Sequence, residues 1–294
     1  MEQRYALQLI AEEKANVQLL RITDGILIGV TNRDDLTGRL ILPDTITELG
    51  KKALSGCTGL TSIVIPDSVT KIGHDVFSDC SSLIRVIIPD SVTKIGDYVF
   101  SNCTHLTELT VDNENPVYCS ENNILYTKDK THLIAAAGGL KGRVVLPDTV
   151  TEISPYAFSG RTGLTGVTIP AAVTWITEYL FSDCSGLKSI VIPDTVTVID
   201  KRAFSRCSSL TSIRIPDSVT KIGQGAFTCC FGLSCITIPC TVTEIADEVF
   251  FWNGLIHIVI PDTVTEIGDG AFSGINPNAH FTVASESVKE LLLN

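Results

Sequence analysis

The stretch "IPDSVTKIGHDVFSDCSSL" at residues 65–83 returns as "IPDSVTKIGDYVFSNCTHL" at residues 88–106, twenty-three positions later. Self-similarity at a fixed period is typical of repeat architectures, in which each repeat is one structural unit. With position 1 defined as the aliphatic residue three places before each proline, nine copies align, and one of them is a residue short. The copies begin at Leu40, Ile63, Val86, Val144, Val167, Ile190, Ile213, Ile236 and Ile258.

Four positions of the repeat are nearly uniform. Position 4 is Pro and position 8 is Thr in all nine copies, position 15 is Phe in eight, and position 18 is Cys in six. Positions 1 and 3 alternate with an outward position 2, which predicts a short strand, and the proline ends it because it cannot donate a ladder hydrogen bond. Pro-Asp-Ser/Thr then predicts a turn. Position 11 is Gly in five copies, among them Gly73, Gly96 and Gly223, and we expect positive φ there.

About eight of the 23 positions are expected to face inward, including the Phe at position 15 and the Cys at position 18. One coil is too thin to bury these side chains alone, so neighbouring coils must stack around a shared core. We therefore expect the Phe side chains to align along the stack. The Thr at position 8 is expected to form a stacked hydroxyl ladder that satisfies backbone groups.

The pattern C-x-x-L-x-x-[IV]-x-[IV]-P-x-x-[VI]-x-x-[IL]-G-x-x-[AV]-F resembles the BspA-like (Treponema pallidum type) leucine-rich repeat. It reads "CSSLIRVIIPDSVTKIGDYVF" at 80–100 and "CSSLTSIRIPDSVTKIGQGAF" at 207–227. The resemblance implies a leucine-rich repeat solenoid, mainly β, of the α/β-type horseshoe kind. It would have a parallel β-sheet on one face and turns with short helical segments on the other. Members of this family are commonly bacterial or protozoan surface proteins implicated in adhesion and in binding host proteins.

Five segments are expected along the chain. Residues 1–39 resemble a diverged island that caps the first coil, because "DGILIGV" before "GRLILPDTITEL" parallels "NNILYTK" before "GRVVLPDTVTEI". The others are a block of three repeats at 40–108, a β-hairpin island at 109–143, a block of six repeats with a terminal strand at 144–283, and a C-terminal capping helix at 284–294. The strand is "HFTV", and the helix has a serine N-cap.

The charge restricts the classes of partner. A net charge of −11 is unfavourable for nucleic acid, which requires a concentrated basic surface, and for anionic membrane surfaces. No apolar run approaches the eighteen residues of a membrane span, so no membrane insertion is expected. The N-terminus has acids where a signal peptide would be apolar, so the protein is cytosolic or a leader has been removed. The family resemblance implies the cell surface or secretion, with the cytoplasm as the alternative.

No group of residues predicts catalysis, a cofactor or a metal site. The five histidines occupy different columns and copies, and we expect them to be solvated. The six position-18 cysteines are either small core residues or thiols near disulfide distance, and the core interpretation is preferred. Asp at position 5 recurs in seven copies, and it is either a turn residue or part of a calcium ladder, of which we prefer the turn residue.

Outward positions of the predicted sheet define a candidate partner-binding face, because six of the nine residues at position 2 are aliphatic. Exposed Val and Ile are explained either by strand propensity or by a protein contact, and both explanations remain open. Trp175 and Trp252 are further candidate anchors, because Trp is enriched at binding hot spots. The candidate face comprises Val64, Arg85, Ile87, Val145, Thr168, Val191, Arg214, Thr237, His257 and Val259, together with Trp175.

The sequence thus predicts a non-enzymatic protein-binding repeat protein without cofactors. An adhesin-like surface protein that binds host matrix or plasma proteins through the sheet face is the preferred interpretation. An intracellular structural or scaffold protein without a host ligand is the alternative. The sequence defines no oligomeric state.

Overall fold

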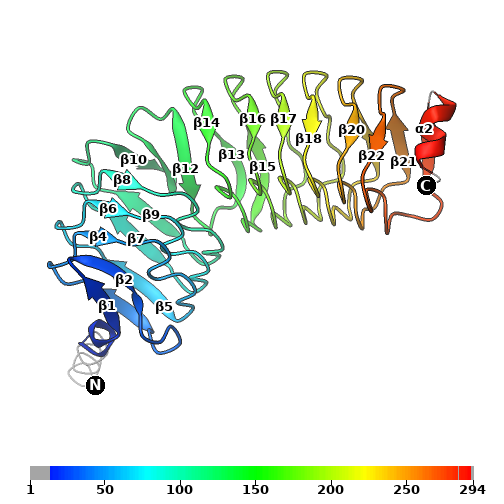
Figure 1. Ribbon diagram of the computed structural model, residues 1–294. Coiled ribbons are helices and arrows are strands. Elements are labelled where there is room, and N and C mark those ends of the chain that lie inside the picture. Colours follow the sequence, from blue (N-terminus) through cyan, green and yellow to red (C-terminus); the bar gives the residue numbers. More distant parts are fainter. Residues whose placement is uncertain (1–13, 284, 293–294) are drawn as a thin grey trace. The chain divides into compact units, whose positions relative to one another are not determined.

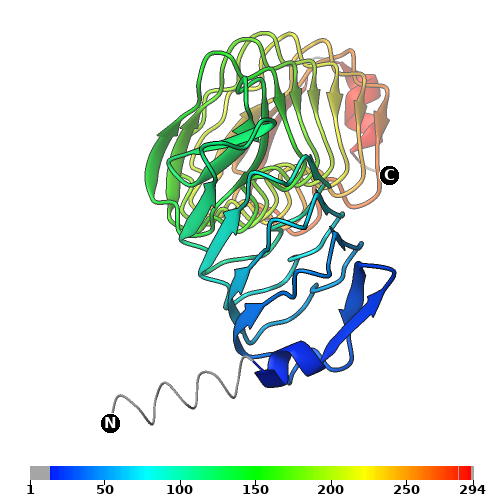
Figure 2. The same cartoon turned by 90° about the vertical axis from the view of Figure 1, so that its left-hand side faces the viewer.

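The computed structural model describes residues 14–283 and 285–292, and Figures 1 and 2 show its elements from two directions. The chain divides into two compact units, unit 1 up to Leu140 and unit 2 from Lys141. Residues 1–13, 284 and 293–294 of the predicted capping segments lie outside the described residues.

The short strands predicted from positions 1 to 3 pair in parallel with those of neighbouring coils, as the family resemblance implied, and we call them the main sheet of each unit. Its order in unit 1 is β3-β5-β7-β9. In unit 2, β13-β15 and β19-β21-β23 form separate groups, and the coil that begins at Ile190 adds a single bridge, from Val191 to Thr168. The strands are β3 Gly38–Ile41, β5 Leu60–Val64, β7 Arg85–Ile88, β9 Glu108–Val111, β13 Gly142–Val145, β15 Leu164–Thr168, β19 Cys235–Thr237, β21 His257–Ile260 and β23 His280–Val283.

A second ladder of two-residue strands, at positions 9 and 10 of the repeat, was not predicted. In it β4, β6 and β8 pair in parallel in unit 1, while β16-β17-β18 and β20-β22 do so in unit 2. The residue at position 9 points outward and the aliphatic residue at position 10 points inward, as in β6 and β18. The bounds are β4 Glu48–Leu49, β6 Lys71–Ile72, β8 Lys94–Ile95, β14 Glu152–Ile153, β16 Trp175–Ile176, β17 Val198–Ile199, β18 Lys221–Ile222, β20 Glu244–Ile245 and β22 Glu266–Ile267.

The prediction of short helical segments opposite the main sheet is wrong, because the nine described coils have turns there. Every coil has one residue with positive φ at position 13 and another at position 17, such as Asp75 (56°) and Asp79 (60°). An α-helix needs right-handed φ at each residue. Left-handed residues four positions apart therefore exclude even one regular helical turn.

The Phe side chains at position 15 stack face to face inside each unit, which confirms the predicted inward column. In unit 1 the rings of Phe77 and Phe100 lie 5.4 Å apart between centroids. In unit 2 the neighbouring rings of Phe181, Phe204 and Phe227 are also separated by 5.4 Å, and all three side chains are fully buried. Offset or parallel stacking of rings at this separation adds to the free energy gained from burial.

Hydroxyl groups at positions 6 and 8 join each coil to the one before it. Thr220 Oγ1 donates to the carbonyl oxygen of Thr197 at 3.3 Å, one example of the predicted Thr ladder. The shorter bonds come from position 6, which sequence analysis did not single out: Ser218 Oγ donates to Val196 O at 2.7 Å. Thr197 O also accepts from Thr220 N at 2.9 Å, so the Thr hydroxyl adds a second, longer bond to a carbonyl that the backbone already satisfies. The Ser hydroxyl at position 6 supplies a hydrogen bond to a different carbonyl of the preceding coil.

Glycine at position 11 was expected to supply positive φ, and this expectation is wrong, because Gly73, Gly96 and Gly223 do not have left-handed φ. Glycine is needed there because the preceding coil passes too close. A Cβ atom on Gly96 would lie 2.5 Å from the backbone nitrogen of His74, and one on Gly223 would lie 2.5 Å from that of Lys201. Such an approach between backbones leaves no room for a side chain.

Antiparallel strands occur before the first coil and after the third. β1 (Leu20–Thr23) and β2 (Ile26–Val30) form a hairpin, and β2 pairs in parallel with β4. β10 (Tyr118–Glu121), β11 (Ile124–Thr127) and β12 (His132–Ala136) form a meander. The β1–β2 and β10–β11 turns have positive φ at both central residues, Asp24-Gly25 and Asn122-Asn123. This geometry matches the twist of a two-residue hairpin.

Side chains from the segment after β9 close unit 1. The buried Asn115 donates through Nδ2 to Pro89 O and Val92 O, at 2.7 and 2.9 Å. The hydroxyl of Tyr118 accepts a hydrogen bond from Ile95 N at 2.9 Å. A tyrosine side chain thus takes the place of the next strand of the second ladder.

The C-terminal end of unit 2 has the predicted strand and helix. β23 pairs with β21, and α2 (Glu286–Leu291) begins after Ser285, whose hydroxyl accepts from Val288 N. Within the described residues, no helix has the length and apolar character needed to cross a membrane.

We expect Phe204→Ala to lower the free energy of unfolding by about 3–5 kcal/mol, because it removes a buried ring from the middle of the stack. Phe231→Ala is the matched control, since that side chain is 57% exposed, and a change within about 0.5 kcal/mol is expected. Urea denaturation of the two variants and the native chain measures both. Equal losses would contradict the stacked-core account.

Candidate functional site

The outward residues of the main sheet in unit 1 form rows across neighbouring strands. Position 2 places Ile41, Val64 and Ile87 in one aliphatic row, which continues to Thr110 of β9. Val64 is 37% and Ile87 41% exposed. A row of aliphatic side chains that faces solvent is therefore a feature of this unit.

Two residues of this row, Val64 and Ile87, line a groove of ≈ 570 Å³ with charged edges, which we call the unit 1 groove. Arg39 and Arg85 lie at the starts of their strands, and Asp67 and Asp112 follow the ends of theirs, so opposite charges line opposite edges. Arg85 Nε forms an ion pair with Glu108 Oε1 at 3.1 Å. Both partners are about half exposed, so the pair orients Arg85 and contributes little to stability.

The predicted face in unit 2 is more exposed and less continuous. Val145 and Val191 are 71% and 70% exposed, and Thr168 lies between them as the strand partner of both. Arg214 is in a coil without a strand at this position, and its Nη1 pairs with Asp194 Oδ1 at 2.8 Å. Thr237 and Val259 form a second short row in β19 and β21.

Two predicted residues have different surroundings from those expected. Trp175 is 51% exposed but belongs to β16 of the second ladder, so it is not part of the main sheet face. The histidines were expected in different columns, and for two of them this is wrong, because His257 on β21 is the strand partner of His280 on β23. The other strand partner of His257 is Cys235 on β19.

The cysteines at position 18 are free thiols that act as buried hydrogen-bond donors. Cys207 Sγ donates to Phe181 O at 3.1 Å, and Cys230 Sγ to Phe204 O at 3.1 Å, so each thiol caps a carbonyl of the preceding coil. In the short copy Asn253 occupies this position, and its Nδ2 donates to Phe227 O at 2.7 Å. These bonds favour the core interpretation of the cysteine ladder.

Burial raises the pKa of these thiols. The pKa of Cys57 is raised to about 11 and that of Cys184 to about 12, in each case mainly by desolvation of the thiolate. A thiol must ionise to act as a nucleophile or to bind a soft metal. The ladder therefore lacks the property that a catalytic or metal-binding cysteine requires.

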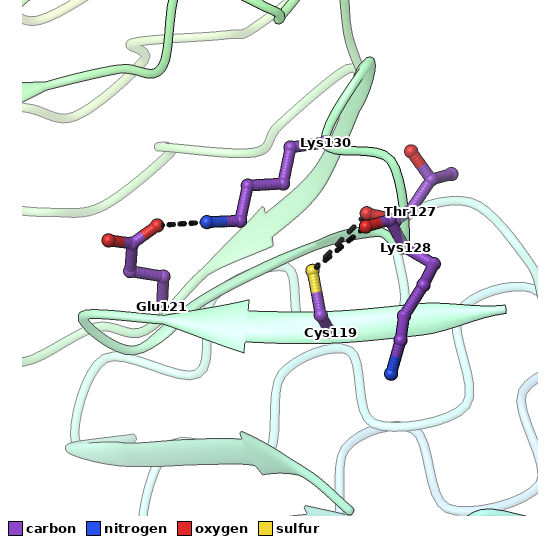
Figure 3. Close-up of polar contacts among 5 residues, drawn as sticks. All are labelled: Cys119, Glu121, Thr127, Lys128 and Lys130. Atoms are coloured by element: carbon purple, nitrogen blue, oxygen red, sulfur yellow. Dashed lines mark hydrogen bonds and ion pairs between the residues drawn. The ribbon is translucent and has the colours of Figure 1, made fainter. Parts of the chain in front are cut away.

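Cys119 in the meander is also held as a thiol (Figure 3). Its Sγ donates to Thr127 O at 3.3 Å across the β10–β11 pair, and burial raises its pKa despite the nearby Lys128 and Lys130. Lys130 Nζ is engaged instead by the carboxylate of Glu121 at 2.5 Å. The five residues of Figure 3 thus join two strands and form no reactive centre.

The aspartates at position 5 are all exposed, and each follows the strand positions and the proline of its coil. In the part of the chain that the structure describes, no three His, Cys, Asp or Glu side chains are grouped so that they could hold a metal ion. Turn formation and solvation account for these carboxylates. The residues are Asp44, Asp67, Asp90, Asp148, Asp194, Asp217 and Asp262.

Comparison with known families gives one match, which spans most of the chain. A model described as BspA type leucine rich repeat region (6 copies) matches residues 34–133, 141–256 and 243–291. No curated protein sequence matches this chain.

Solved bacterial structures share the fold. A leucine rich cell surface protein from Faecalibacterium prausnitzii is 28% identical with a TM-score of 0.70, covering 88% of this chain and 62% of that one. The pneumococcal vaccine antigen PcpA is 23% identical with a TM-score of 0.75, covering 87% and 65%. A leucine-rich repeat protein from Eubacterium ventriosum is 22% identical with a TM-score of 0.62, covering 86% and 92%. The chain spans less than two thirds of the length of the first two.

The thiols are expected to divide into two kinetic classes. At pH 8 a thiol with a pKa near 11 is ionised in only about one molecule per thousand, and burial excludes the reagent as well. We therefore expect Ellman's reagent to label the exposed Cys235 and Cys240 rapidly in the native protein and the six ladder thiols only in urea. Rapid native labelling of Cys207, located by peptide mapping, would contradict the buried ladder.

Proposed function

Because this chain belongs to the BspA type leucine-rich repeat family, we propose that it is a non-enzymatic protein-binding protein that acts through the outward face of its main sheet. The observation that carries the proposal is the set of solvent-facing aliphatic side chains on that sheet. Val145 and Val191 are each at least 70% exposed, and Ile87 is 41% exposed. Contiguous exposed apolar surface with a polar rim is typical of protein contacts.

The unit 1 groove supports recognition of a protein segment rather than a small molecule. It is lined by the aliphatic side chains of Val64 and Ile87, with arginines along one edge and aspartates along the other. Opposite charges on the two edges would fix the orientation of a bound segment, and complementary charges contribute more to specificity and association rate than to affinity. A partner segment with aliphatic side chains flanked by an acid on one side and a base on the other fits this surface.

We further propose that the partners are host matrix or plasma proteins and that the protein acts at the cell surface, as an adhesin does. The support is the described cell-surface character of the Faecalibacterium prausnitzii relative, which shares the fold and 28% of its residues. A scaffold inside the cell, without a host ligand, is the competing function.

We expect Ile87→Lys and Val191→Lys each to weaken binding by at least about tenfold, since a buried hot-spot residue contributes roughly 2 kcal/mol or more to an interface. Native chain and variants are tested against an immobilised panel of purified matrix and plasma proteins by surface plasmon resonance. Thr162→Lys, on an exposed turn of unit 2, is the matched control because it adds the same charge. The control should bind as the native chain does.

One outcome would contradict the proposed binding surface, and another would contradict the proposed adhesin role. If a panel protein binds but both sheet variants and the control retain full affinity, the sheet face is not the binding surface. If no panel protein binds and fractionation of the source cells finds the chain only in the cytosol, the scaffold function replaces the adhesin. Thermal melting of each variant ensures that a loss of binding is not a loss of folding.

A further inference from the structure

Three aromatic residues on the turns of unit 2 depart from the repeat at neighbouring points. Position 16 is Ser or Thr in the other eight copies but Phe251 in the eighth. Position 19 is Ser or Thr in the first six copies but Phe231 in the seventh. Position 17, next to Phe251, holds Trp252. We call these three residues the aromatic patch.

The distribution of phenylalanine shows that the patch is specific to this place. Of the eleven Phe residues, eight occupy the buried position 15 and one, Phe281, lies in β23. The remaining two are Phe231 and Phe251. Neither belongs to the column of stacked Phe rings, although Phe251 is half-buried.

The patch residues lie on adjacent coils. Cys229 N donates to Phe251 O at 2.8 Å, which sets the seventh coil beside the eighth. A Cβ atom on Gly254 would collide with the carbonyl oxygen of Phe231, so the chain just after Trp252 runs directly against Phe231. The rings of Phe251 and Trp252 are 6.2 Å apart between centroids. Phe231 and Trp252 remain 57% and 56% exposed.

Trp252 is held in a conformation that its residue type disfavours. Its φ is 51°, in the left-handed region where Gly, Asn and Asp are the usual residues. The next coil has Gly274 at the same position, and a Cβ atom there would lie 2.8 Å from Trp252 Nε1 and closer still to Cδ1. The neighbouring coil therefore provides the space in which the indole rests. Every coil has a left-handed residue at this position, so the backbone conformation belongs to the repeat, and the exposed indole is what distinguishes this coil.

The charges around the patch indicate its occupant. The turn residues 205–211, 228–234, 251–256 and 273–279 contain one charged side chain, Arg206, and no acid. Arg206 is itself paired with Asp183, at 3.6 Å. The whole chain carries a net charge of −11, so two copies repel each other over most of their surface. An acid-free aromatic strip is where two such copies can approach with the least repulsion.

We propose that the aromatic patch is a self-association surface, on which a second copy of this chain docks patch to patch. A two-fold contact of this kind is self-complementary, since each residue of the patch meets the patch of its partner. The main sheet faces are not used and stay available to other proteins, so this inference is independent of the proposed function.

The test compares the native chain with a variant that restores the residues of the repeat: Phe231→Ser, Phe251→Ser and Trp252→Gly. Sedimentation velocity should show a monomer–dimer equilibrium for the native chain up to about 100 μM, a range in which weak dimers of this size are detected. The triple variant should remain monomeric. Its melting temperature should equal or exceed that of the native chain, because each new residue is one that other coils use at that position.

Salt provides a second readout. Screening reduces the repulsion between two negative copies while leaving an apolar contact intact, so dimerisation should strengthen several-fold between about 0.05 and 0.5 M NaCl. A dimer held by ion pairs would weaken instead. Val145→Thr combined with Val191→Thr is the matched control, which removes exposed aliphatic groups from the main sheet and should dimerise as the native chain does.

A native chain that stays monomeric throughout this range would overturn the proposal, and so would a triple variant that still dimerises. If the triple variant does not fold, the single variant Trp252→Gly is tested in its place, and it too should remain monomeric. If the main-sheet control loses the dimer and the triple variant keeps it, self-association takes place on the sheet face. That result would also overturn the proposal.

Discussion

Each coil of this protein is too thin to shield its own apolar side chains from water, and contact between consecutive coils is what makes the fold possible. The Phe rings at position 15 show this most directly, because the faces of each ring are covered by the rings of the coils on either side. The thiol at position 18 and the hydroxyls at positions 6 and 8 act in the same direction, since each donates to a carbonyl of the preceding coil. Burial and hydrogen bonding are thus both properties of neighbouring coils rather than of one.

This dependence decides which positions are free to acquire function. The residue types at inward positions, and the glycines that the preceding backbone approaches closely, are restricted by contact with neighbouring coils. Position 2 of the main sheet is exposed in several coils, and so are Phe231 at position 19 and Trp252 at position 17. At these positions the copies differ. The aliphatic row with Val64 and Ile87, and the aromatic residues around Trp252, are both found at such positions. Specific recognition can therefore change without altering the core.

Much of the fold follows from the twenty-three-residue period alone. Strand positions, the inward Phe column and the Thr ladder were predicted because the same residue, or the same aliphatic type, recurs at the same place in at least eight of the nine copies. The left-handed residues at position 13 were not, because Lys52, Tyr98 and Glu248 are residue types that give no indication of positive φ. The position-6 ladder could have been found, since eight of the nine copies have Ser or Thr there. For the candidate site, the sequence identified the exposed aliphatic residues. The pairing of His257 with His280 could have been found as well, because the two lie one repeat period apart.

Asn253 shows what the interior column of sulfur atoms is for. Its amide nitrogen reaches the same carbonyl position that cysteine sulfurs reach in other coils, and at a shorter distance. Seven of the nine coils therefore have a compact hydrogen-bond donor at this position, Arg161 and Ile275 being the exceptions, and sulfur chemistry as such is dispensable. A solenoid with asparagine in place of these cysteines would keep the hydrogen bonds and would have no thiol in the column to oxidise. The architecture therefore suits an oxidising exterior as well as a reducing compartment.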